Sequence, residues 1–75
     1  MQQLVLRIDD INPDGVRVRI NWGAFVVGAS FFIPCINVTK GTRQLNAIAR
    51  SKGYVIRSMT VVENDKIGVR TWRMV

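Results

Sequence analysis

Apolar and polar side chains alternate with a period of two near the start of the chain. Apolar residues occupy every second position over residues 4 to 8 and again over residues 16 to 20. Such alternation is typical of a strand with one buried face. The intervening residues 10 to 15 contain a proline that presets φ and end on a glycine that accepts positive φ, which indicates a turn. The pattern predicts an antiparallel hairpin whose polar face carries Arg17 and Arg19.

The next stretch has no clean period. Residues 21 to 30 contain two glycines among apolar residues, which favours a folded loop that covers the core. Residues 31 to 33, Phe-Phe-Ile, are typical of a short buried strand, which Pro34 should end because proline cannot donate to a ladder. Trp22 and Phe25 are expected to be core anchors, as large aromatic side chains usually are.

A helix is predicted over residues 38 to 52. Leu45, Ile48 and Ala49 share one face by i, i+3, i+4 spacing. Asn37 or Thr39 can cap its start, and Gly53 occupies the position of a left-handed C-terminal residue. The opposite face carries a basic stripe with no acid to neutralise it. This stripe consists of Lys40, Arg43 and Arg50.

A second hairpin is predicted to close the chain. Residues 54 to 62 and 67 to 74 are strand-like, and Asn64-Asp65 suits the positive φ of a two-residue turn. In that register Arg57 lies opposite Trp72. One face would carry Arg57, Met59, Arg70 and Trp72, and the other Ile56, Thr60, Val62, Ile67, Val69, Thr71 and Arg73. Neither face is cleanly apolar, so the pattern leaves open which one meets the helix.

These elements define an α+β fold in a single small basic domain, residues 1–75. The expected order is β-β-β-α-β-β, with an N-terminal hairpin, a short strand and a C-terminal hairpin in a small antiparallel sheet packed by one helix. Residues 20 to 39 form an uncharged run of twenty residues, about the length of a membrane span. Its asparagines, glycines and Pro34, and its strand-like context, favour a soluble chain with no membrane partner. We therefore expect a cytoplasmic location.

Charge is distributed unevenly along the sequence. The formal net charge is +6 and the pI is about 10.8. No Asp or Glu occurs between Gly15 and Val62, and all five acids lie in two turn-like segments. The body of the domain should therefore carry a positive field, which attracts polyanions.

Few residues are suited to catalysis or metal binding. The chain has no histidine, and Cys35 is its single cysteine. One thiol makes neither an internal disulfide nor a structural zinc site. No nucleophile–base pair or phosphate-binding glycine loop is present in the sequence. We therefore expect no enzyme activity, no cofactor and no metal, and we interpret Cys35 as a small buried hydrophobe.

Two segments together resemble small proteins encoded by tailed bacteriophages. Residues 28 to 34, Gly-Ala-Ser-Phe-Phe-Ile-Pro, are similar to a Gly-x-Ser-Phe-Phe-x-Pro element of that group, and residues 68 to 73 are similar to its terminal Gly-Val-Arg-x-Trp-Arg strand. A basic helix stands between them, and the resemblance covers about residues 22 to 75. Ala29 stands where the group is expected to have an acid. The resemblance implies a phage origin and a location in the host cytoplasm, with no activity to transfer.

The charge pattern favours a non-catalytic nucleic-acid-binding protein with duplex DNA as its target. Arginines outnumber lysines eight to three, and guanidinium groups match phosphates and guanine edges in pairs. Trp72 could stack on a base, although a lone strand tryptophan is more often a core anchor, which is the interpretation we favour here. The candidate binding residues are Arg17, Arg19, Lys40, Arg43, Arg50, Arg57, Arg70 and Arg73.

The alternative is a small interaction protein that binds an acidic surface of a host protein. Such a partner could be an RNA polymerase or a defence factor, and the protein would inhibit or redirect it, for example to regulate transcription. The same positive field would steer that association. An apolar patch left exposed around Trp22, Phe25 and Phe31 would favour this alternative. A homodimer formed through an open strand edge is compatible with both interpretations.

Overall fold

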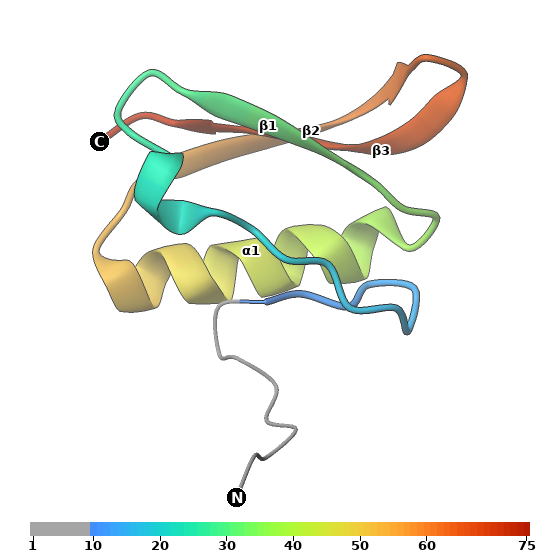
Figure 1. The fold of residues 1–75 in the computed structure, drawn as a ribbon, viewed down its shortest axis with the longest axis horizontal. Helices are drawn as coiled ribbons and strands as arrows, with labels where there is room; N and C mark the ends of the chain where they lie inside the picture. Colours follow the sequence, from blue (N-terminus) through green and yellow to red (C-terminus); the bar gives the residue numbers. More distant parts are fainter. Residues whose placement is uncertain (1–9) are drawn as a thin grey trace, which may run out of the picture.

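The protein has two layers, a three-stranded sheet and one helix beneath it (Figure 1). The fold comes from a computed structural model that describes residues 10–75. Its elements, in chain order, are the 3-10 helix η1 (Trp22–Ala24), strand β1 (Ser30–Pro34), helix α1 (Val38–Lys52), strand β2 (Ile56–Glu63) and strand β3 (Lys66–Arg73).

The sheet is antiparallel throughout, with strand order β1-β3-β2. The predicted order β-β-β-α-β-β is therefore wrong, since the described chain has three strands and one helix. The short strand exists, as β1, and ends at Pro34. The amide of Cys35 donates to the Ile67 carbonyl, so strand alternation turns the Pro34 nitrogen away from β3. Proline is tolerated at this position because β1 is an edge strand, and a backbone N–H on its open side would have no strand to pair with.

The predicted N-terminal hairpin is not a sheet element in the described residues. Its first strand, residues 4 to 8, lies outside them. The turn is present, with Gly15 at φ 81, but Ile11 and Val18 form an isolated bridge rather than a ladder. Val18 and Ile20 nevertheless pack against the core. The alternation therefore reflects an extended segment with one side on the core, and it does not require a hydrogen-bonded neighbour along its length.

Helix α1 begins and ends where the sequence predicts. The Asn37 side chain accepts a hydrogen bond from the Lys40 amide at 3.1 Å. At the other end Gly53 adopts a left-handed conformation, with φ 75, and its amide donates to the carbonyls of Ala49 and Arg50. These caps satisfy backbone groups that a helix end otherwise leaves unpaired.

The C-terminal hairpin also has the predicted register. Asn64 and Asp65 have φ of 52 and 62, as a two-residue turn requires, and Arg57 lies opposite Trp72. The structure decides which face meets α1. Val69 and Thr71 are fully buried on the inner face, where the Thr71 hydroxyl pairs with that of Ser58 at 3.0 Å.

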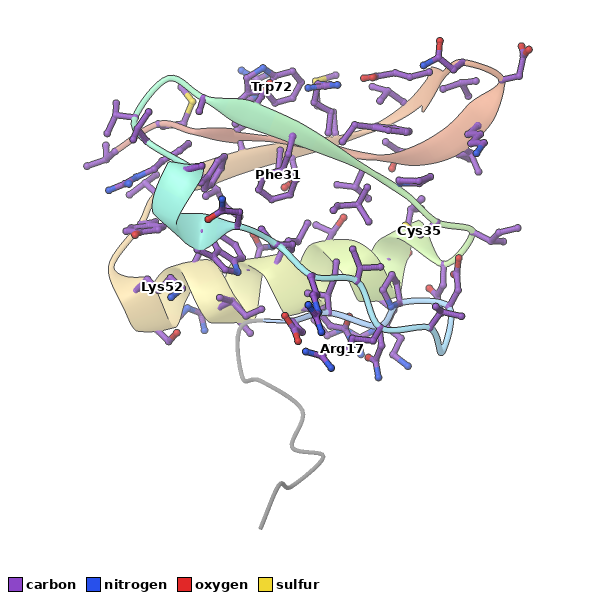
Figure 2. The ribbon with its side chains drawn as sticks, in the orientation of Figure 1. Arg17, Phe31, Cys35, Lys52 and Trp72 are labelled. Carbon is purple, nitrogen blue, oxygen red and sulfur yellow. The ribbon has the colours of Figure 1, made fainter. Side chains whose placement is uncertain are left out.

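The core lies between the inner face of the sheet and α1. Leu45 and Ile48 of α1 meet Ile33 of β1 and Val69 of β3 there. Trp22 and Phe25 are buried beside them, as predicted, with ring centroids 5.6 Å apart. The expectation for the other tryptophan was wrong, because Trp72 lies on the face of the sheet away from α1 (Figure 2).

The uncharged run that could suggest a membrane span is divided among several elements. It includes η1, β1 and the first residues of α1. Over residues 10–75, no helix combines the length and the apolar character needed to cross a membrane.

Candidate nucleic-acid interface

Most described acids are engaged in contacts within the molecule. Asp10 pairs with Arg17 at 2.6 Å, and its side chain is nearly buried. Glu63 accepts two hydrogen bonds from the Arg70 guanidinium, at 2.6 and 2.7 Å. Asp14 accepts the backbone amides of Ile36 and Asn37, both at 2.8 Å. Of the acids in residues 10–75, only Asp65, at the hairpin turn, has no such contact, so the basic side chains elsewhere are left largely uncompensated.

These contacts also shift the acids toward the charged form. The hydrogen bonds from the Asn37 and Ile36 amides lower the pKa of Asp14 below its ordinary value. The side-chain hydrogen bond from Arg70 lowers the pKa of Glu63 and raises that of Arg70. Both acids therefore remain charged and paired at neutral pH, which removes them and Arg70 from the groups most available to an external ligand.

Helix α1 brings three of the predicted basic residues onto one surface. We call Lys40, Arg43 and Arg50 the α1 surface. Arg43 and Arg50 are exposed and Lys40 is half-buried, and none of them forms an ion pair within residues 10–75. At about 1.5 Å rise per residue, they are spaced about 4.5 and 10.5 Å apart along the axis. The three cations share one face because of the helical period. It places Leu45, Ile48 and Ala49 against the core and the cations on the opposite side.

A groove lined mostly by residues with polar groups runs beside the α1 surface. Its volume is about 400 Å³, and it lies between the first half of α1 and the edge of β2 at Thr60. The lining residues are Val38, Thr39, Thr42, Arg43, Asn46 and Thr60. Hydroxyl and amide groups of this kind contact phosphate oxygens and sugars in nucleic-acid complexes. The groove therefore adds neutral hydrogen-bonding groups next to the three cations.

The remaining predicted residues do not join the α1 surface. Arg57 is exposed and Arg70 half-buried on the opposite layer, on the face of the sheet away from α1. Arg17 is held by Asp10, whereas Arg19 is exposed on the N-terminal segment beside the edge of β1. Apart from Arg73, the candidates thus occupy three separate surfaces.

Arg73 has a structural role. Its guanidinium donates to the Phe25 carbonyl at 3.0 Å and to the Val75 carbonyl at 2.9 Å. The same group lies 3.6 Å from the centroid of the Tyr54 ring. These contacts fasten the end of β3 to the loop after η1 and to the segment after α1, so Arg73 is not positioned for an external phosphate.

Sequence reasoning placed Arg57, Met59 and Arg70 on the face of Trp72 but missed that Phe32 of β1 joins them. Phe32 and Met59 share the outer side of the sheet with it, because alternation along β1 directs Phe31 and Ile33 inward and Phe32 outward. The signal was present in the alternation, but three consecutive apolar residues suggested a strand buried on both faces. Only the position of α1 shows that one face is uncovered.

Cys35 is buried, in agreement with its interpretation as a small hydrophobe. Burial, and then the nearby Asp14 charge, raise the pKa of its thiol. A raised pKa suppresses the thiolate, which is the nucleophilic form. In the described part of the chain, no three His, Cys, Asp or Glu residues are grouped so that they could hold a metal ion.

Comparisons with known proteins find no relative. No family model matches the chain, and no curated protein or solved structure is significantly similar to it.

Proposed function

We propose that this protein is a non-catalytic nucleic-acid-binding protein that contacts duplex DNA through the α1 surface. One observation carries the proposal. Lys40, Arg43 and Arg50 form a row of cations on one helix face, while three of the four described acids are engaged within the molecule. A helix with such a row can lie along the phosphates that flank a groove. Because the sequence resembles phage proteins, we also propose that the protein acts in the cytoplasm of the host cell.

The binding should be strongly salt-dependent. Neutralising three phosphates gives a log–log slope of roughly −2.7, or about a 40-fold loss of affinity between about 50 and about 200 mM salt. Fluorescence anisotropy with a labelled duplex measures this directly. An affinity that does not change with salt would contradict the proposal.

A matched pair of variants tests which surface binds. Arg43→Gln removes one cation of the α1 surface and should reduce the salt slope by about 0.9. Lys66→Gln removes the same charge at the hairpin turn, outside the α1 surface and its neighbouring groove, and should leave the slope unchanged. Equal effects of the two substitutions would mean that only net charge matters, and the α1 surface would then be the wrong interface.

The alternative, a protein partner with an acidic surface, has one observation in its favour. Ile36, Val62 and Ile67 are exposed to 81%, 67% and 44%, and the hydrogen bond from the Cys35 amide to the Ile67 carbonyl holds these positions near one another. The patch expected from the sequence does not support it, because Trp22 and Phe25 are buried. Absence of duplex binding at low salt would favour this alternative.

A further inference from the structure

The outer face of the sheet is a distinct surface from the one that we propose for duplex DNA. Helix α1, η1 and the N-terminal segment from residue 10 onward all lie on the inner side, so no described element covers the outer side (Figure 1). Figure 2 shows Trp72 on this uncovered side and Phe31 on the side of α1. We define the outer sheet face by Phe32, Arg57, Met59, Arg70 and Trp72, which strand pairing and alternation place together.

Trp72 lies on the central strand β3, near one end of this face. It is only half-buried, and its cross-strand neighbours are Ser30 on β1 and Arg57 on β2. A hollow of about 380 Å³ beside the indole is lined by Arg57, Met59, Trp72 and Met74. The hollow thus combines an aromatic ring, two flexible thioethers and one guanidinium. That composition suits a planar, partly apolar group with a negative charge attached.

The charges of the outer sheet face complement a phosphate. Arg57 is exposed and has no ion pair within the described chain. The acid on the same face, Glu63, is already neutralised by its two hydrogen bonds from Arg70. A phosphate next to Trp72 would therefore meet the Arg57 guanidinium without an unpaired carboxylate in its vicinity.

A second ring lies diagonally across the sheet from Trp72. Phe32 is opposite Arg70, two residues from Trp72 along β3, and the Arg70 guanidinium is 5.8 Å from its ring centroid. The ring lies over Gly68, since a Cβ there would be 2.8 Å from Phe32 Cζ. Two aromatic positions on adjacent strands, each beside an arginine, match the way exposed sheets stack successive unpaired bases.

From these observations we propose that the outer sheet face binds single-stranded nucleic acid, with a base stacked on Trp72 and its phosphate contacted by Arg57. A duplex would not use this site, because its base faces are occupied by neighbouring bases, whereas the faces of unpaired bases are accessible for stacking. This inference does not depend on the α1 surface, because the two surfaces lie on opposite layers of the fold.

Trp72→Leu tests the stacking. Leucine keeps an apolar side chain at the site but removes the π-face, so the affinity for a labelled oligothymidine should fall about 5- to 150-fold. Duplex affinity should not change. Met59→Leu is the matched control, since it alters the same hollow without removing a ring, and it should bind the oligothymidine as the unaltered protein does. Equal single-strand affinity of Trp72→Leu and the unaltered protein would overturn the proposal.

A second readout needs no substitution. An oligonucleotide that carries bromouracil should crosslink on irradiation, and mass spectrometry of the digested protein should locate the crosslink at Trp72 or Phe32. A crosslink confined to α1, or no single-strand binding at about 50 mM salt, where phosphate contacts are strong, would overturn the proposal. Loss of duplex binding in Arg43→Gln with retained oligothymidine binding would separate the two surfaces.

Discussion

Gly68 shows how a single missing Cβ determines the approach of two strands. It lies buried in β3 opposite Pro34, and a Cβ on it would overlap the Ile33 carbonyl oxygen and crowd Phe32 Cζ at 2.8 Å. The first obstacle is backbone that is paired into the sheet, so it cannot rotate away as a side chain could. Glycine is therefore required for the close packing of β1 on β3.

Gly68→Ala should lower the free energy of unfolding by about 3 kcal/mol, near the upper end for overpacking, because β1 must shift to admit the methyl group. Urea denaturation followed by circular dichroism measures the change. Gly23→Ala is the control, since its added Cβ would meet only Asn21 Oδ1, at 3.4 Å, and it should change stability by less than about 0.5 kcal/mol. Similar stabilities of the two variants would refute this account of Gly68.

At the scale of elements, α1 depends on a residue far from it in sequence. Asp14 accepts the Ile36 and Asn37 amides just before the helix begins, and Asn37 in turn caps α1 through the Lys40 amide. The acid also places a negative charge near the positive end of the helix dipole. The turn of the N-terminal segment thereby connects to the start of α1.

This contact predicts a pH dependence. The pKa of Asp14 is lowered from 3.8 in the fold, so its stabilisation is fully present above the unfolded value and is lost as pH falls through the folded value. Asp14→Asn should therefore melt at a lower temperature than the unaltered protein at about pH 6, and the difference should shrink toward about pH 3. Thermal melts across that range test it, with Asp65→Asn at the exposed turn as the control.

A melting difference between Asp14→Asn and the unaltered protein that stays constant across this range would show that the carboxylate charge is not involved. Glu63, whose pKa is also lowered, loses its stabilising contact with Arg70 in the same direction. That contribution is common to both proteins, so it cancels in the comparison.

At the scale of the whole molecule, the two layers separate two chemically different surfaces. One is the α1 surface with its neighbouring groove, and the other is the outer sheet face with its aromatic residues. They share a thin core between the inner face of the sheet and α1. A ligand on either surface would stabilise the same core, because binding to the folded state alone raises its apparent stability.

Cys35 reports on the integrity of that core. It is buried, burial raises its pKa, and its sulphur would lie 3.3 Å from a Cβ on Gly41. Its reaction with a thiol reagent at neutral pH should therefore be slow in the folded protein and rapid in denaturant. Absorbance of the released chromophore measures the rate. A folded-state rate equal to the denatured rate would show that the fold opens at Cys35.

Binding at either surface should slow the modification of Cys35 further, because the reaction requires opening of the fold. The unaltered protein with duplex, and then with oligothymidine, provides the two arms of this measurement. Acceleration by either ligand would mean that it binds an opened form.

Sequence by itself determined the elements whose signals are local. The limits of α1 follow from Asn37 and Gly53, and the hairpin register follows from Asn64-Asp65, because caps and two-residue turns depend on the conformation of a few adjacent residues. The alternation of residues 16 to 20 indicated correctly that Val18 and Ile20 face the core, whereas Val16 is exposed. It did not predict the absence of a ladder, since pairing also depends on a neighbouring segment.

Tertiary structure alone decided which side of the hairpin is covered and which cations remain available. The inner and outer faces of β2 and β3 are similarly mixed in sequence, so only the placement of α1 left Trp72 uncovered. Arg17, Arg70 and Arg73 look equivalent to Arg43 along the chain, but each is held by a partner at least seven residues away. Charge is a property of composition, whereas its availability depends on contacts between residues that are distant in sequence.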